Sequence, residues 1–262
     1  MRDFSLSAYA EYLSAIQGSY PVILRFDEFF AMDARPDQFC LIRHDVDRKP
    51  GNALRMAELE HRMDIPATYY FRAKRHTFKP EIINKIAAMG HEIGYHYECL
   101  SDTNGDMVEA LKDFETNLQR FRDITEIKTI SMHGQPLKPI DNRDLWRESG
   151  NHRMLQTRFQ IAGEVYLDID YREIAYVNDT GRNWTANENN VRDKVRSTVR
   201  LDAENGEELL AILRNNPPGK MIFQIHPERW EENPVSWYIQ SLKDQGLNLA
   251  KKLIRRYWSA AG

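Results

Sequence analysis

The stretch that decides the fold is residues 39–47, which read FCLIRHDVD. Its first four residues are apolar and predict a buried strand, and polar residues follow directly. Because residues two apart in an extended chain point to the same side, Asp45 and Asp47 can face one cavity together. Neighbouring carboxylates shift each other's pKa or share a metal ion, so the pair is a candidate for chemistry. A pair of surface or helix-capping acids is the alternative, since Pro50 follows closely.

Three later apolar stretches each lead into a histidine at or just beyond the end of the stretch. They are residues 91–96 with His96, 129–132 with His133 and 221–226 with His226. Similar stretches without a terminal histidine occupy 67–71, 165–170 and 174–179. Between several of these stretches, apolar residues recur at helical spacing. The clearest apolar stripe is Met107, Leu111, Phe114, Leu118 and Phe121.

This alternation of strand and helix signals predicts an α/β fold with a parallel sheet and crossover helices. In βα barrels the active site is built from the carboxyl ends of the strands. Asp45, His96, His133 and His226 all fall at such ends. We therefore predict a βα barrel whose site lies around these four residues.

Length, charge and cysteine content restrict the class of protein. The chain has 262 residues, with 36 basic and 39 acidic side chains and a net charge of -3, which excludes a general nucleic-acid binder. No linker or repeat divides it, so we expect one domain over residues 1–262 with a helical extension at about 1–36. No transmembrane segment is expected, because no stretch approaches ~18 consecutive apolar residues. Two cysteines, Cys40 and Cys99, argue against a disulfide framework and for a cytoplasmic protein with free thiols.

Two segments are open to more than one interpretation, and a third supports one role. The cations between 251 and 256 are typical of a solvated helix face, with contact to an anionic membrane or a phosphate as the alternative. Residues 178–184, NDTGRNW, read as an Asx-type turn, or place Arg182 and Trp184 on a substrate. The pair His226-Pro227 fixes the chain beside an imidazole, which suits a general acid.

The order of these motifs resembles the polysaccharide deacetylase family, a group of carbohydrate esterases that includes chitin, peptidoglycan and nodulation-factor deacetylases. The likeness rests on Asp-Val-Asp at 45–47, GHEIGYH at 90–96 and the late strand ending in His226. Residues 64–71, DIPATYYF, are also similar to the family's second-strand signature. The resemblance implies a distorted (β/α)7 barrel, a divalent metal that is zinc, cobalt or nickel, and hydrolysis of an acyl group on a sugar.

Carried over residue by residue, the resemblance makes Asp45 the general base, Asp47 and His96 metal ligands and His226 the general acid. Two departures matter. The family has adjacent aspartates, and here Val46 separates them, so the base and ligand roles of the two can be exchanged.

The family's second ligand histidine lies four residues after the first, and here that position is Leu100. His133 is the expected third ligand. His44, Glu98 or a water is the alternative, unless the metal is absent altogether.

The resemblance therefore implies a zinc-dependent hydrolase that removes an acetyl or formyl group from an acylated amino sugar. It also implies a nucleotide- or lipid-linked sugar in surface-polysaccharide, O-antigen-like, biosynthesis, because relatives that act on such sugars match this chain better than secreted chitin enzymes do. The candidate sugar platforms are Tyr95, Trp146, Trp184 and Trp230, and the candidate anchors for a uronate or phosphate are Arg43, Arg143, Arg182 and Arg229. A metal-free cyclic amide or imide hydrolase and an inactive sugar-binding barrel are the alternatives. The sequence assigns no oligomeric state.

Overall fold

The computed structural model describes residues 2–135, 138–182, 184, 195–201 and 203–246. The strands are β1 (Ile23–Leu24), β2 (Phe39–Val46), β3 (Thr68–Phe71), β4 (Glu92–Tyr97), β5 (Thr129–Met132), β6 (Gly163–Glu164), β7 (Ala175–Asn178) and β8 (Lys220–Ile225). The helices are α1 (Leu6–Ser19), α2 (Phe26–Ala31), α3 (Pro50–Arg62), α4 (Pro80–Ala88), α5 (Cys99–Asp102), α6 (Met107–Arg122), α7 (Asp144–Arg147), α8 (Ser149–Thr157), α9 (Gly206–Asn215) and the 3-10 turn η1 (Pro227–Arg229). Residues 234–246 are helical as well.

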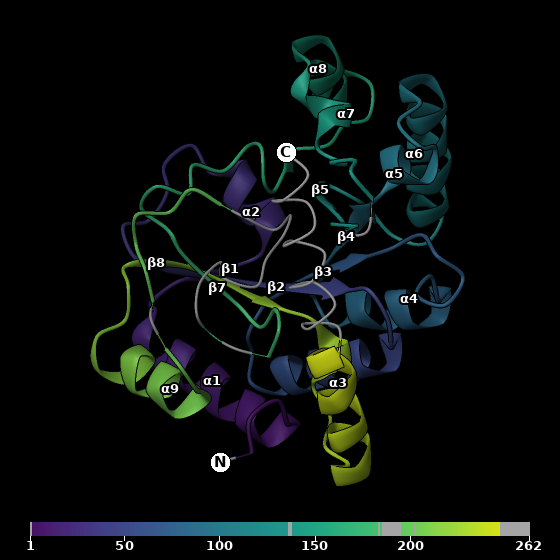
Figure 1. Ribbon diagram of the computed structural model, residues 1–262. Coiled ribbons are helices and arrows are strands. Elements are labelled where there is room, and N and C mark those ends of the chain that lie inside the picture. Colours follow the sequence, from purple (N-terminus) through teal and green to yellow (C-terminus); the bar gives the residue numbers. More distant parts are fainter. Residues whose placement is uncertain (1, 136–137, 183, 185–194, 202, 247–262) are drawn as a thin grey trace, which may run out of the picture.

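The strands form one parallel sheet in the order β6-β5-β4-β3-β2-β8-β7, with β1 added beside β2 (Figure 1). Strand β2 holds the sheet together, because it pairs with β8 along one edge, from Phe39 to His44. Its other edge pairs first with β1 at Cys40 and Leu41 and then with β3 from Arg43 to Val46. The sheet curls with helices around it, which confirms the predicted distorted (β/α)7 barrel.

Side chains of β2 alternate between two cores. Phe39 and Leu41 join the apolar cluster that includes Phe26 and Phe29 of α2, whereas Cys40 and Ile42 join the cluster beneath the outer helices. The same alternation separates the polar residues that follow. Arg43 and Asp45 share the side of Phe39, and His44 turns to the outer side, where its Nε2 lies 2.6 Å from Glu60 Oε1 of α3.

Three expectations about the elements need correction or completion. The apolar stretch 165–170 forms turns and not a strand, because the Glu164 carboxylate accepts hydrogen bonds from the backbone N–H groups of Tyr166 and Leu167, both at 2.8 Å. Residues 1–36, expected to be a helical extension, hold α1 and α2 and also β1, which pairs with the sheet. The sequence from Pro234 to Trp258 also predicts a closing helix, which is present at 234–246, and its remainder lies outside the described residues.

At Gly94, strand β4 passes so close to Tyr70 and Thr129 that there is no room for a side chain. A Cβ there would collide with the Tyr70 ring and lie 3.1 Å from the Thr129 carbonyl oxygen. The Tyr70 ring has little freedom, because its hydroxyl is 2.8 Å from Thr129 Oγ1. We expect Gly94→Ala to lower the free energy of unfolding by about 1–3 kcal/mol in urea titrations. Gly51→Ala is the control, since nothing lies within 4 Å of a Cβ in α3, and an equal loss in both variants would contradict this account.

Glu92 of β4 makes stability depend on pH. Burial and the nearby Asp27 raise its pKa from 4.5 to about 7, although hydrogen bonds from Thr129 and Thr68 oppose the shift. A carboxyl with a raised pKa contributes fully below pH 4.5, and its contribution is lost as the pH rises through 7. Wild-type protein should therefore lose about 3 kcal/mol of unfolding free energy between pH 4.5 and pH 8 through this group.

Glu92→Gln should remove this loss. The amide oxygen can still accept from Asp27 N and Thr68 Oγ1, and the amide nitrogen can donate to Thr129 Oγ1. Urea titrations should find the variant more stable than wild type at pH 8 and not at pH 4.5. The control is Glu81→Gln at an exposed position of α4, and a pH-independent effect of Glu92→Gln would disprove the assignment.

Candidate active site at the carboxyl rim

The carboxyl ends of the strands bring the predicted polar residues to one rim. Asp45 lies near the end of β2 with Asp47 just beyond it, and His96 lies near the end of β4. His133 follows β5 and His226 follows β8. Since all strand pairings are parallel, these ends meet at the same edge of the sheet.

Two imidazoles converge on Asp47. The Nε2 atoms of His96 and His133 lie 3.4 and 3.5 Å from Asp47 Oδ1. His96 Nδ1 is 3.0 Å from the Ser131 carbonyl oxygen, and His133 Nδ1 is 3.0 Å from Glu98 Oε2. Both of those partners only accept, so each Nδ1 donates and each Nε2 is left with its lone pair when the ring is neutral. Asp47 Oδ1 is buried and has no hydrogen-bond partner.

This donor set can be tested against a divalent ion. In the geometry of the structure, no group of three or more His, Cys, Asp and Glu side chains among the described residues forms a complete metal centre. Ligand atoms around a tetrahedral zinc lie about 3.3 Å apart, which both Asp47 contacts approach. Ligand histidines also donate their other ring nitrogen to a carboxylate or carbonyl, as His96 and His133 do here. The donor chemistry and these two distances suit the ion, whereas the three side chains are not arranged as a closed site in the described structure.

Without an ion, the same charges favour protonation of His133. Burial opposes the charged imidazole, but Asp47 and Glu98 outweigh it and raise the pKa of His133 to about 10. An ion would take the place of that proton, so metal binding at this position must release one.

Asp45 has a different environment from Asp47. Its Oδ1 accepts from Arg43 Nε at 2.7 Å, and its Oδ2 accepts from Arg43 Nη2 at 2.8 Å and from Gln224 Nε2 at 2.6 Å. Burial raises the pKa of this carboxyl, but Arg43 and the neighbouring His96 and His226 more than offset it, so the pKa is lowered. Asp45 therefore stays ionised at neutral pH, with Oδ2 3.6 Å from His96 Nε2.

His226 is held by an aspartate that the sequence reading took for part of a turn. Asp179 Oδ1 lies 2.6 Å from His226 Nδ1 and 2.6 Å from Arg229 Nη1. Its Oδ2 accepts from the His226 backbone N–H and from Trp230 Nε1, both at 2.9 Å. Burial and Arg229 oppose protonation of His226, but Asp179 outweighs them and raises the pKa of the imidazole.

The sequence patterns did not identify Arg72 as a site residue, and they indicated Glu98 only as a possible metal ligand. Arg72 follows β3 and holds Glu98 with two hydrogen bonds, of 2.9 and 2.8 Å. Glu98, considered above as a possible ligand, instead lies behind His133. Asp179 and Arg72 carry the same signal that identified the histidines, a polar residue directly after an apolar strand.

The expected sugar platforms lie in the core. Tyr95 packs against Phe114, and Trp146 packs against the same ring. Trp184 and Trp230 lie together beside the N-terminal segment, with ring centroids 6.1 Å apart. All four side chains are buried, so in this structure their rings are not available to a substrate.

The expected arginine anchors are also engaged within the protein. Arg43 is fully buried against Asp45, Arg229 binds Asp179, and Arg143 binds Asp141 at 2.7 Å. Arg182 lies between Phe4 and Trp237 and is 3.7 Å from Asp244. None of the four is placed at the rim as an open anion anchor. His44, another possible ligand, faces Glu60 on the outer side of the sheet.

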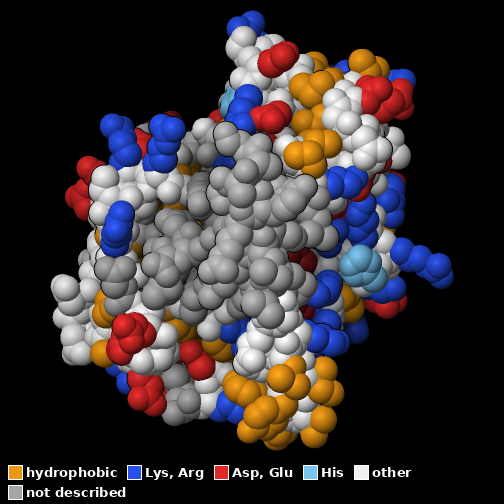
Figure 2. All heavy atoms as spheres, viewed as in Figure 1, with side chains coloured by type: hydrophobic (Ala, Val, Ile, Leu, Met, Phe, Trp, Pro, Cys, Tyr) orange, Lys and Arg blue, Asp and Glu red, His pale blue; other side chains and the backbone are white. Residues whose placement is uncertain are grey.

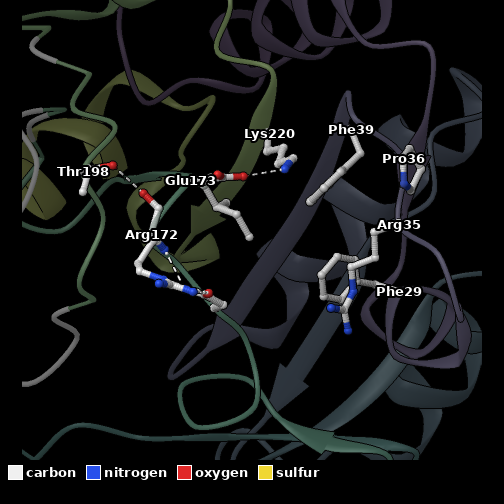
Figure 3. Close-up of a pocket in the computed structure, with 10 residues that line it drawn as sticks. Phe29, Arg35, Pro36, Phe39, Arg172, Glu173, Thr198 and Lys220 are labelled. Atoms are coloured by element: carbon white, nitrogen blue, oxygen red, sulfur yellow. Dashed lines mark hydrogen bonds and ion pairs between the residues drawn. The ribbon is translucent and has the colours of Figure 1, made fainter.

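A pocket of about 530 Å³ lies at the other end of the barrel (Figure 3). Phe39 and Lys220, the first residues of β2 and β8, line it. Lys220 is 2.8 Å from Glu173, and Arg172 pairs with Asp170. Because this pocket is at the amino ends of the strands, it is separate from the rim.

No protein-family model and no curated protein matches the sequence. Solved structures with a similar arrangement include a family 4 carbohydrate esterase from Bacillus anthracis, 11% identical, with 91% of this chain and 86% of the other covered and a TM-score of 0.40. A mutant peptidoglycan deacetylase from Bacillus subtilis is 17% identical, with 86% and 96% covered and a TM-score of 0.44. A CE4 family pseudoenzyme from Bacillus anthracis is 13% identical, with 80% and 62% covered and a TM-score of 0.42. At such low scores and identities, these likenesses carry no functional argument.

The Asp179 cluster should stabilise the protein at neutral pH. Burial raises the pKa of Asp179, but Arg229 and His226 outweigh it and lower the pKa from 3.8 to about 2. That contribution is present above pH 3.8 and lost as the pH falls through 2. Asp179→Asn should cost about 2 kcal/mol of unfolding free energy at pH 7, and less near pH 2. Denaturant titrations with the exposed Asp33→Asn as control test this, and a constant gap at every pH would refute it.

Proposed function

We propose that this protein is a metal-dependent hydrolase that removes an N-acyl group from a sugar. The observation that carries the proposal is the buried Asp47 Oδ1, which has no hydrogen-bond partner and lies 3.4 and 3.5 Å from two imidazole nitrogens. A buried carboxylate oxygen needs a positive charge close by, and an ion shared with both imidazoles would supply it in place of a proton on His133.

Asp47, His96 and His133 would hold the ion. A divalent cation in such a site polarises an acyl carbonyl and lowers the pKa of water toward 7. The best candidate is zinc, with cobalt or nickel as alternatives, because the ligands are two imidazoles and one carboxylate.

The protein's own groups would move the protons. Asp45 is ionised and fixed by Arg43 and Gln224, so it can take a proton from the attacking water without losing its orientation. His226 carries a raised pKa and is oriented through Nδ1 by Asp179, which leaves Nε2 to deliver a proton to the leaving sugar amine. The two groups lie on neighbouring strands, since β2 pairs with β8.

The substrate class comes from the sequence resemblance. It favours an acetylated or formylated amino sugar, nucleotide- or lipid-linked, in surface-polysaccharide biosynthesis. A cytoplasmic location is part of this proposal, and two free buried thiols, Cys40 and Cys99, support it. No helix in the described part of the chain is long and apolar enough to cross a membrane.

A metal-free hydrolase of cyclic amides or imides is the second candidate. One observation favours it: His133 lies between Asp47 and Glu98, so these charges satisfy one another when the imidazole is protonated. Leu100 stands where the resembled family has a ligand histidine. Stoichiometric metal with activity that depends on it would exclude this candidate.

Two matched substitutions separate the ligand from the base. Asp47→Asn should weaken zinc binding at least tenfold, because the amide is a poorer ligand than the carboxylate. Asp45→Asn should keep the zinc and lower the rate of acyl release about 10²–10⁴-fold, through loss of the base. Elemental analysis after dialysis against zinc gives the metal content.

Release of acetate or formate from N-acylated amino sugars, free and nucleotide-linked, gives the activity. Equal zinc content in both variants would contradict the assignment of ligand and base. No zinc in wild-type protein would refute the metal-dependent mechanism.

A further inference from the structure

The helix at 234–246 turns its apolar face away from the protein. Asn233 begins it, with Oδ1 accepting from the backbone N–H groups of Val235 at 2.9 Å and Ser236 at 3.1 Å. The outward stripe is Val235, Tyr238, Ile239 and Leu242, which are 67%, 65%, 49% and 68% exposed. Spacings of three, one and three residues place these side chains on one helix face.

The inward face of the helix is polar and firmly held. Trp237 Nε1 donates to the Asp3 carbonyl oxygen at 2.7 Å, and the Arg182 guanidinium lies 4.7 Å from the centre of the Trp237 ring. Asp244 is buried, 3.7 Å from Arg182, and Gln240 is buried and donates to Asp244 at 3.1 Å. These contacts fix the rotation of the helix, so the apolar stripe cannot turn inward without breaking them.

This arrangement is the reverse of an ordinary surface helix, whose apolar face packs on the core. Elsewhere in the described part of the chain, only Val108 of α6 is a large hydrophobic side chain with comparable exposure. Figure 2 shows the apolar side chains gathered at the lower end of the molecule, where Figure 1 places this helix. Concentrated apolar exposure of this kind marks a surface that is covered in use.

Charge indicates what covers it. Lys243 is exposed beside Leu242. The sequence that follows, 247–262, holds Lys251, Lys252, Arg255 and Arg256 and has no Asp or Glu. Apolar side chains followed in the sequence by clustered cations are the features by which a helix lies in the interface of an anionic membrane, with the cations at the lipid headgroups.

We propose that the 234–246 helix docks the protein on an anionic lipid surface through Val235, Tyr238, Ile239 and Leu242. This inference does not depend on the proposed hydrolase activity. A second copy of the chain is a poorer occupant. Four side chains present only a few hundred Å², whereas a stable dimer buries about 800 Å² per partner.

Vesicle flotation tests the proposal. Full-length protein is mixed with vesicles of phosphatidylcholine and phosphatidylglycerol, or of phosphatidylcholine alone. We expect binding to the anionic vesicles and at least about tenfold weaker binding to the neutral ones. Val235→Ser combined with Leu242→Ser should weaken binding about tenfold or more, whereas the equally exposed Val108→Ser should not.

Circular dichroism and the urea unfolding midpoint report whether each variant is folded. Replacing Lys251 and Lys252 with Gln should weaken binding to the anionic vesicles. The difference from wild type should shrink as the salt concentration rises. Failure of wild-type protein to float with anionic vesicles would overturn the proposal. So would sedimentation showing a dimer that the Val235→Ser, Leu242→Ser variant abolishes, because the stripe would then be a contact between copies.

Discussion

The parallel pairing of β2 with β3 on one side and β8 on the other is the constraint on which the site depends. It places Asp45 and Asp47 between two groups of side chains. His96 and His133 come from β4 and the end of β5, beyond β3, and His226 and Asp179 follow β8 and β7 on the opposite side. The candidate metal ligands and the candidate acid therefore reach the two aspartates from opposite directions. No single loop has to carry both.

The two aspartates show how environment separates the roles of identical side chains. Asp45 is saturated by Arg43 and Gln224, and its charge is balanced inside the protein. Asp47 Oδ1 has no hydrogen bond and lies 3.4 and 3.5 Å from two imidazole nitrogens. Buried charges persist only when paired, so Arg43 is better understood as the partner of Asp45 than as a group for the substrate.

Sequence reasoning predicted the sheet and the rim because both follow from local signals. An apolar stretch ending in a polar residue marks a strand and its carboxyl end, and alternation along 39–47 already put Asp45 and Asp47 on one side. The sequence does not show which partner each side chain contacts across the barrel. Asp179 read as a turn residue because its contact with His226 joins positions 47 residues apart.

The burial of the aromatic residues could not be predicted for the same reason. A sequence does not distinguish a tryptophan in a core from one in a cleft. Trp146 and Trp230 lie among other rings, and only the packing of α6 and of the N-terminal segment shows this. The turns at 165–170 could not be predicted either, because they depend on hydrogen bonds from the backbone N–H groups of Tyr166 and Leu167 to the Glu164 carboxylate.

X-ray absorption at the zinc edge of the zinc-loaded protein reports the ligands of the proposed site. A site formed by Asp47, His96 and His133 predicts one zinc per chain with two imidazole nitrogens and oxygen ligands at about 2.0–2.1 Å. A His133→Ala sample should show one imidazole fewer, because Leu100 offers no second histidine. Zinc that fails to bind, or a wild-type spectrum with fewer than two imidazoles, would contradict it.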